Sequence, residues 1–414
     1  MQPRQHNDPH LRGNRLRSGA NPVPPLEGAN YPRAMERVFD SLAVTATRRV
    51  AGWLSPLGLS PLALDDALAS VTPLWRVHHL QARLVSRQAE TPSASTLVLQ
   101  VGPAFPRLKP GQYVVVGVEI QGVCHRRAYS PRAVPGRRDQ IAITVQRQPG
   151  GRVSGHLVDE LPVGSWLEIA PPAGEFVLPA PTPRQVLLIA GGSGITPFMA
   201  MLQHLHQTAP DTLVTLVYFA RSAVDRIFAK DLQGLARVWR QLHYVPVDSL
   251  AHTPSQAHHP TPQADRVLSL ALLDAACRDW RHTEAYCCGP APLMDTARAL
   301  WRDHAPEGEL HLEAFAAPRA SGDPQARHQI RLQRGREHID FTAAGHHTLL
   351  VAGEAAGYHI KHGCRQGICH ECTCRLRQGS VKDLVSGERI DGEGQPIRLC
   401  VSSAMSDVEL ESLN

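Results

Sequence analysis

Apolar and polar residues alternate with a period of two from about Arg76 onward, the pattern of half-buried β-strands. Turn residues such as Lys109-Pro110-Gly111 separate the alternating runs. The predicted strands are His79–Val85, Ser95–Val101, Gln112–Ile120, Gln140–Gln146 and Ser165–Ala170. A series of strands without helices between them predicts an all-β domain, a small barrel, over residues 76–181.

The pattern changes at Arg184, where continuous apolar runs alternate with segments of helical period. We expect strands at Val186–Ala190, Leu213–Phe219 and His243–Val247, and helices at Pro197–His206 and Ala229–Trp239. This order predicts a parallel α/β sheet over residues 182–317. A stretch rich in His, Pro and Gln, residues 251–265, is interpreted as a surface loop within it.

The N-terminal residues follow neither pattern. Residues 1–30 are polar and contain several prolines and arginines, which predicts a disordered tail. Residues 31–75 place apolar residues at roughly helical spacing, with a second short helix expected at Leu62–Ser70. This helical N-terminal extension could pack on the barrel, or could touch a membrane surface through its apolar face and arginines.

Composition narrows the function classes. The chain has 414 residues, of which 43% are hydrophobic and 20% charged, and this balance is typical of a soluble globular protein of several domains. No apolar run is long enough to span a membrane and no signal peptide is recognisable, so we expect a cytoplasmic location. The net charge is +5 without a block of Lys or Arg, which argues against nucleic-acid binding.

The cysteine positions indicate metal or redox chemistry. Five of the nine cysteines lie between Cys364 and Cys400. Cys364, Cys369 and Cys372 have the spacing C-x4-C-x2-C, and Cys400 follows 28 positions later, as in the plant-type [2Fe–2S] pattern. A zinc site is the alternative, but the second cysteine pair that zinc sites usually contain is missing. We interpret Cys374 as a buried strand residue.

The segment around these cysteines predicts a small domain of its own. Strands are expected at Thr373–Leu376 and Ser380–Lys382, which fits a β-grasp fold over residues 328–414. A Pro-, Gly- and Ser-containing linker, residues 318–327, separates this domain from the α/β sheet.

Two short motifs in the predicted barrel fit a flavin site. Arg127-Ala128-Tyr129-Ser130 follows a strand expected at Gly117–Val123, and Gly151-Arg152-Val153-Ser154-Gly155 begins a helix. Arg127 can face a phosphate, Tyr129 can flank the flavin ring, and Ser130 can hydrogen-bond near the reactive ring nitrogen. Glycine at 151 and the amides of Val153 and Ser154 can bind a phosphate at the helix N-terminus. Either motif alone would read as an ordinary strand edge or turn.

The predicted α/β domain carries nucleotide-binding turns. A buried strand runs into Gly191-Gly192-Ser193-Gly194-Ile195-Thr196-Pro197, with Pro197 expected at the first helical position. Cys288-Gly289-Pro290 repeats this arrangement after a later strand, before a helix expected at Pro292–Trp301. Glycines at such turns let a pyrophosphate approach the backbone.

The next strand is followed by Ala220-Arg221-Ser222. A cation at this position suits the 2′-phosphate of NADPH, whereas an acid is common where NADH binds. Arg221 and Ser222 therefore favour NADPH, with NADH as the alternative. The alternative interpretation is that Arg221 is a solvated side chain at the end of a strand and binds no phosphate.

Together these residues resemble the ferredoxin–NADP reductase superfamily, in the version with a plant-type ferredoxin domain at the C-terminus, over residues 76–414. The resemblance implies FAD, with FMN as the alternative, a nicotinamide nucleotide and a [2Fe–2S] cluster. It implies catalytic roles for Ser130, Cys288 and Glu313, and a place near the flavin for Phe315 in Leu312-Glu313-Ala314-Phe315. The residues implied to bind cofactor or metal are Arg127, Tyr129, Ser130, Gly151, Val153, Ser154, Gly191, Gly192, Gly194, Thr196, Pro197, Arg221, Ser222, Gly289, Pro290, Phe315, Cys364, Cys369, Cys372 and Cys400.

The expected function is to take two electrons from NADPH as hydride, pass them to flavin, and release them singly through the cluster to an acceptor protein. The segments Leu54–Trp75 and Gly363–Lys382 also resemble bacterial reductases that serve membrane acyl-CoA desaturases, which implies a desaturase as acceptor, with peripheral contact at the inner membrane as an alternative to packing of the extension on the flavin domain. The alternatives are the reductase of an aromatic-ring oxygenase and a redox-sensing binding protein.

Overall fold

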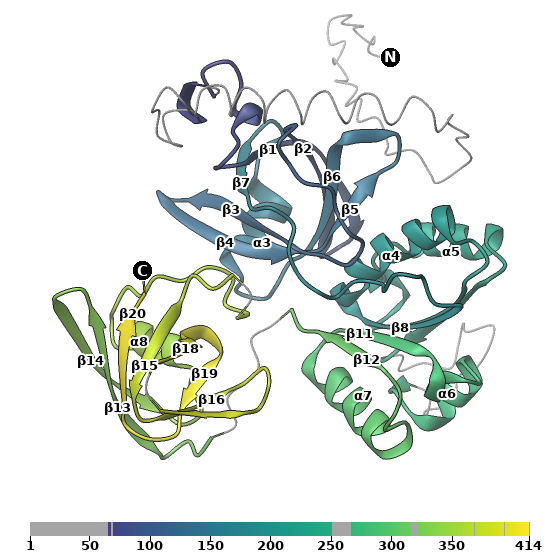
Figure 1. Cartoon of the computed structure of the whole chain (residues 1–414). Helices are drawn as coiled ribbons and strands as arrows, with labels where there is room; N and C mark the ends of the chain where they lie inside the picture. The colour runs from purple at the N-terminus through teal and green to yellow at the C-terminus, as the bar shows by residue number, and fades with distance from the viewer. Residues whose placement is uncertain are drawn as a thin grey trace, which may run out of the picture.

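The computed structural model describes residues 65–67, 69–250, 266–315, 322–367, 369–392 and 394–413. These residues form three units, shown in Figure 1: a β-rich unit in blue, an α/β unit in teal and green, and a β-rich unit with one helix in yellow-green. The predicted tail 1–30, most of the N-terminal extension and the loop 251–265 lie outside the described residues.

The first unit is a seven-stranded antiparallel sheet with the strand order β4-β3-β7-β1-β2-β6-β5. Its strands are β1 (Gln81–Thr91), β2 (Ala94–Val101), β3 (Val114–Ile120), β4 (Val123–Tyr129), β5 (Pro131–Val134), β6 (Arg137–Gln146) and β7 (Trp166–Ile169). Alternate residues of the strands, such as Leu97 and Leu99, point into one apolar core. The short helix α3 (Arg152–Gly155) continues into a π-helical turn, His156–Glu160, whose Leu157 closes that core.

Strand β4 corrects one sequence-based prediction. The strand expected at Gly117–Val123 is wrong, because the chain turns at Gln121 and Gly122, both of which have positive φ. Residues 123–129 then return as β4, paired antiparallel with β3 from Val114↔Tyr129 to Ile120↔Val123. The motif that begins at Arg127 thus lies inside a strand at the sheet edge.

One buried carboxylate binds the segment that leads directly into β1. Asp65, expected in the first turn of a helix at Leu62–Ser70, is fully buried. Its carboxylate accepts the backbone N–H groups of Val77 at 2.9 Å, His78 at 3.1 Å and His79 at 2.7 Å. Burial works against ionisation, but these donors outweigh it and lower the pKa of Asp65.

The second unit is a five-stranded parallel sheet with the order β10-β9-β8-β11-β12. The strands are β8 (Gln185–Gly191), β9 (Leu213–Ala220), β10 (Leu242–Asp248), β11 (Glu284–Cys288) and β12 (Leu310–Glu313), and the helices are α4 (Ile195–Thr208), α5 (Ala229–Val238), α6 (Leu270–Ala276) and α7 (Ala291–His304). This confirms the predicted parallel α/β sheet.

Helices cover both faces of that sheet, α4 and α5 on one side and α6 and α7 on the other (Figure 1). Along β8, Leu188 belongs to the core under α4 and α5, whereas Leu187 and Ile189 belong to the core under α6 and α7. Burial on both faces explains why this strand is continuously apolar. Because these strands pair in parallel, the carboxyl ends of β8, β9, β11 and β12 lie at one edge of the sheet.

The third unit is a β-grasp arrangement. A five-stranded sheet of order β14-β13-β20-β15-β18 packs against α8 (Leu349–Ala355), beside a three-stranded sheet of order β17-β16-β19. The strands are β13 (Arg327–Arg334), β14 (Glu337–Ala344), β15 (Thr373–Gln378), β16 (Ser380–Asp383), β17 (Arg389–Asp391), β18 (Gln395–Arg398), β19 (Ser402–Ala404) and β20 (Val408–Ser412). The three-domain fold class expected from the sequence is thereby confirmed, while the domain boundaries stay predictions.

Among the described residues, no helix combines the length and the apolar character needed to cross a membrane. The cytoplasmic location and the peripheral membrane contact through residues 31–75 stay predictions.

Candidate functional site

The cysteines of the predicted cluster motif meet in two touching pairs. The backbone N–H of Cys364 donates to Cys369 Sγ at 3.1 Å, and that of Cys369 donates to Cys364 Sγ at 3.4 Å. The thiols of Cys372 and Cys400 hydrogen-bond to each other. The loop supplies three cysteines, and the end of β18 supplies Cys400 through the turn Leu399–Val401.

The cysteine loop fits a [2Fe–2S] group. Its backbone N–H groups point at sulfur: that of Gln366 reaches Cys364 Sγ at 3.3 Å, and that of Gly367 reaches Cys400. Such donors stabilise thiolate ligands. Gly363 is needed because a Cβ there would lie 2.7 Å from Cys369 Sγ. Cys374 is buried in the strand behind the loop, as expected.

The other cysteines outside the loop differ among themselves. Cys277 and Cys287 are buried, as apolar residues would be. Cys124 is exposed on the edge strand β4, and its thiol donates to the carboxylate of Glu168 at 3.7 Å.

The Arg-x-Tyr-Ser motif lies at the end of β4, facing the third unit. Ser130 is 4% exposed, and its Oγ has no hydrogen-bond partner in the described chain. A buried hydroxyl without a partner is costly, so this oxygen fits a site completed by a polar ligand. Tyr129 packs on the barrel core, and burial raises its pKa.

Positive charge gathers around this motif. Burial lowers the pKa of His125, and the charges of Arg127, Arg152, His362 and Arg365 lower it further. Arg127 comes from β4, Arg152 from α3 and Arg365 from the cysteine loop. Cations held this close together fit a bound phosphate, although Arg365 is already paired with Glu354.

The second flavin motif begins α3 as predicted. The amide of Gln148 donates to Ser154 Oγ at 3.0 Å, and this hydroxyl donates to Gly151 O at 3.2 Å, while Val153 is buried. An open cavity of about 360 Å³ lies beside this turn, and its lining includes Gln148, Gly151 and Arg152. The cavity and its polar backbone fit the phosphate end of a nucleotide.

The two glycine turns of the α/β unit touch each other. A Cβ on Gly194 would lie 2.0 Å from the carbonyl oxygen of Cys288, and one on Gly289 would lie 3.0 Å from the Cα of Gly191. Gly192 has a φ of +55°. Only glycine permits this approach. The turns thus form one floor at the carboxyl edge of the sheet, where nucleotides bind in such folds.

Helix α4 begins earlier than the sequence suggests. The turn Gly192–Gly194 leads directly into Ile195, so Pro197 is the third helical residue and the predicted first position is wrong. Its missing N–H is still among those that have no partner within a helix. Thr196 is buried, and its hydroxyl donates to Ser193 O at 3.0 Å. Pro290 precedes α7 directly.

Cys288 and Glu313 are register partners at the ends of β11 and β12. Cys288 is fully buried, and burial, followed by the charge of Glu313, raises the pKa of its thiol. Burial also raises the pKa of Glu313 to about 8, and its Oε2 has no hydrogen-bond partner. A neutral thiol and a protonated carboxyl side by side could hold a proton near a bound nicotinamide or flavin.

Arg221 and Ser222 lie after β9 as expected, but they share a partner that the sequence analysis did not identify. Asp225 accepts hydrogen bonds from Arg221 at 2.8 Å and from Ser222 at 2.7 Å. This acid therefore competes for two of the donors that a 2′-phosphate would use, Arg221 Nη2 and Ser222 Oγ. Its position three residues after Ser222 was the available signal.

Within the described part of the chain, hydrogen bonds join the cysteine loop to both other units. Arg127 Nη1 donates to Gly363 O at 3.4 Å, and Gln366 Nε2 donates to Phe315 O. Burial raises the pKa of Tyr113, and the charges of Cys364, Cys369 and Glu313 raise it further, so Tyr113 lies near both the cysteine loop and the end of β12. Gln366 was not among the expected site residues.

Comparisons with known proteins agree with this arrangement. Family models match an oxidoreductase FAD-binding domain at residues 81–178, an oxidoreductase NAD-binding domain at 188–299 and a 2Fe-2S iron–sulfur cluster binding domain at 334–405. An NADPH oxidoreductase of Mycobacterium tuberculosis is 32% identical, over 88% of this chain and 92% of its own length. A glycine betaine monooxygenase reductase subunit of Chromohalobacter salexigens is 27% identical, over 82% of this chain and 97% of its own.

A solved structure shares the fold. Phthalate dioxygenase reductase, described as a modular structure for electron transfer from pyridine nucleotides to [2Fe–2S], superposes with a TM-score of 0.55 at 24% identity. The match covers 81% of this chain and 98% of that one. The cofactors are accordingly FAD, NAD(P)H and a [2Fe–2S] cluster. The chain belongs to the ferredoxin–NADP reductase superfamily, as an oxidoreductase that carries its 2Fe–2S domain on the same chain.

Proposed function

We propose that this oxidoreductase takes electrons from NADPH and delivers them one at a time to a protein acceptor of the oxygenase class. The observation that carries the proposal is the docking of the cysteine loop, through Gly363 and Gln366, against both Arg127 and Phe315. Bound flavin supplies the exchange between a two-electron donor and a one-electron cluster.

Each group of residues has a positioning task in this proposal. The glycine floor around Gly194 and Gly289 admits the nucleotide pyrophosphate, and Arg221 and Ser222 hold its 2′-phosphate. Arg127 and the amides of Val153 and Ser154 hold the flavin phosphate. Ser130, with its unpartnered hydroxyl, orients the flavin ring, while the buried thiol of Cys288 and the half-buried carboxyl of Glu313 lie beside it.

Cys364, Cys369, Cys372 and Cys400 are the proposed cluster ligands. The assay compares Cys369→Ser with Cys124→Ser, which alters an exposed cysteine outside the loop. Cys369→Ser should abolish NADPH-dependent reduction of cytochrome c and leave reduction of ferricyanide largely intact, whereas Cys124→Ser should preserve both. Equal loss of both activities in Cys369→Ser would contradict the assigned electron route.

Relatives support an oxygenase-type acceptor. Similar chains bear the names glycine betaine monooxygenase reductase subunit and phthalate 4,5-dioxygenase oxygenase reductase subunit. The narrower prediction of a membrane fatty-acyl desaturase rests on Leu54–Trp75, most of which lies outside the described residues. Reconstitution with a desaturase in vesicles, and separately with a ring-oxygenase component, would decide between them by product formed per NADPH consumed.

A redox-sensing role makes a different kinetic prediction. A sensor would bind the nucleotide without rapid flavin reduction, so rapid bleaching of flavin absorbance on mixing with NADPH favours the reductase. Slow bleaching, together with tight nucleotide binding, would favour the sensor.

A further inference from the structure

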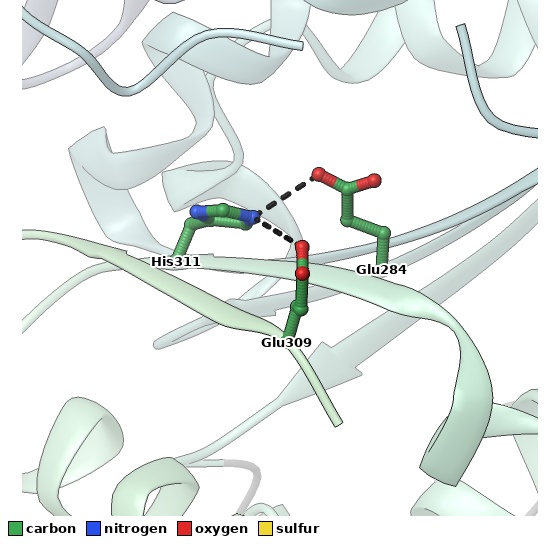
Figure 2. A group of neighbouring side chains, drawn as sticks. All are labelled: Glu284, Glu309 and His311. Atoms are coloured by element: carbon green, nitrogen blue, oxygen red, sulfur yellow. Dashed lines mark hydrogen bonds and ion pairs between the residues drawn. The ribbon is translucent and has the colours of Figure 1, made fainter. Parts of the chain in front are cut away.

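A histidine and two glutamates converge at the amino-terminal edge of the parallel sheet of the second unit (Figure 2). The glycine floor lies at the opposite, carboxyl edge of this sheet. Glu284 begins β11, His311 lies in β12, and Glu309 directly precedes β12. His311 Nε2 lies 3.1 Å from Glu284 Oε1 and 3.7 Å from Glu309 Oε2. One ligand atom from each of the three residues lies within 4.8 Å of the others. The proposed electron route uses none of them.

The spacing of these atoms suits one small ion. Two ligands bound about 2.1 Å from a tetrahedral Zn²⁺ lie about 3.4 Å apart. The separations of 3.1 and 3.7 Å bracket that value, so only small side-chain shifts are needed. An imidazole with two carboxylates is a donor set that Zn²⁺ and similar divalent transition metals accept.

The backbone and one tyrosine hold two of the ligands in place. β11 and β12 are paired, with Tyr286 opposite His311, and Ala285 N–H donates to Glu309 O at 3.0 Å. The Tyr286 ring stacks on the His311 ring with centroids 4.5 Å apart. Its hydroxyl lies 2.8 Å from Glu284 Oε1, a second-layer contact of the kind that orients metal-binding carboxylates.

The entrance lies on the Glu309 side. The Glu309 side chain is 73% exposed, whereas that of Glu284 is only 15% exposed. An ion arriving from solvent would meet Glu309 first, and water could fill any remaining coordination position. Two ionised carboxylates carry a charge of −2, which equals and opposes the charge of a divalent ion.

We propose that Glu284, Glu309 and His311 bind one divalent transition-metal ion, for which Zn²⁺ is the probe. The site adds a second metal to the protein, separate from the cysteine loop. The Tyr286 hydroxyl, which contacts Glu284, also lies 3.1 Å from Val177 O, in the segment that joins the barrel to the parallel sheet.

The test is titration of the cluster-loaded full chain with Zn²⁺ by calorimetry. The variants are His311→Ala and Glu309→Gln, and the matched controls are His282→Ala and Glu307→Gln, two exposed neighbours outside the cluster. Zinc that binds to cysteines contributes equally in every variant and cancels in the comparison.

We expect the unaltered protein and both controls to bind one equivalent more than His311→Ala, and Glu309→Gln to bind this equivalent at least tenfold more weakly. Identical titrations of the unaltered protein and His311→Ala would overturn the proposal. Glu309→Gln changes an exposed side chain and should fold normally, which keeps the test decisive if His311→Ala is unstable. Electron transfer is not measured, so failure of the proposed reductase function would leave this result unaffected.

Discussion

Gln366, two residues after the first cysteine of the cluster loop, donates a hydrogen bond from its side chain to the carbonyl oxygen of Phe315, near the end of the α/β unit. Together with the contact between Arg127 and Gly363, it holds the loop against both reductase domains. Electron transfer within the chain can therefore use a docked arrangement, because no swing of the 2Fe–2S domain is needed to bring its loop to the flavin motif.

Replacing Gln366 tests this docking. Gln366→Ala removes the side-chain donor but leaves the backbone amide that reaches Cys364 Sγ. We expect reduction of cytochrome c by NADPH to slow several-fold, with ferricyanide reduction and the visible spectrum of the cluster unchanged. Gln333→Ala is the control, since the Gln333 side chain donates within its own hairpin, to Gly335 O, far from the cysteine loop in sequence. Unchanged cytochrome c reduction in Gln366→Ala would show that the contact does not limit transfer.

The glycine floor gives a prediction about stability and nucleotide binding. In Gly194→Ala the new Cβ would meet the backbone carbonyl of Cys288, which cannot move aside cheaply. We expect a loss of about 1–3 kcal/mol or more in the free energy of unfolding, and loss of NADPH binding. Gly234→Ala, in the open middle of α5, should instead gain roughly 0.5–1 kcal/mol. Thermal unfolding and nucleotide titration measure both, and an unaffected Gly194→Ala would refute the close approach.

Glu313 makes stability depend on pH. Burial raises its pKa from 4.5 to about 8, so between these values the folded protein keeps a proton that the unfolded chain has released. The free energy of unfolding then falls as pH rises through this window. Glu313→Gln has no titratable carboxyl at this position. The melting temperature of the variant minus that of the unaltered protein should therefore rise by a few degrees between pH 5 and pH 8. Parallel curves, like those expected for the exposed Glu307→Gln, would exclude a raised pKa.

Asp225 should weaken the hold on NADPH. Its carboxylate competes with a 2′-phosphate for Arg221 and Ser222 and repels the phosphate charge. Asp225→Asn should therefore tighten binding of 2′,5′-ADP about five- to tenfold, which corresponds to about 1–1.4 kcal/mol, and should leave 5′-AMP binding unchanged. Asp211→Asn, an exposed acid elsewhere in the domain, is the control. Weaker 2′,5′-ADP binding in Asp225→Asn would mean that the acid supports the site.

The sequence predicts best the elements whose burial is uniform. The strand through Leu187 and Leu188 is covered on both faces, so its apolar run is unmistakable. β4 is the opposite case: it is an edge strand whose residues are exposed or half-buried, so Cys124 and Arg126 leave no apolar period to recognise.

The same contrast holds for the candidate site. Cysteine and glycine spacing within one loop is local, so the grouping of Cys364, Cys369 and Cys372 could be expected from the sequence. Contacts such as Gln366 with Phe315 join segments 51 positions apart, and local pattern carries no information about them. The pairing of Glu284 with His311 likewise depends on the register of two strands.

Asp65 has a consequence for dissecting this protein into working parts. A fragment that starts at Arg76 would keep Val77, His78 and His79 but lack the carboxylate that accepts their N–H groups. Those N–H groups would hydrogen-bond to water instead, and the segment that leads into β1 would no longer be held in place by this carboxylate. A flavin domain cut from this chain for transplantation into another reductase should therefore carry the residues from Asp65 onward.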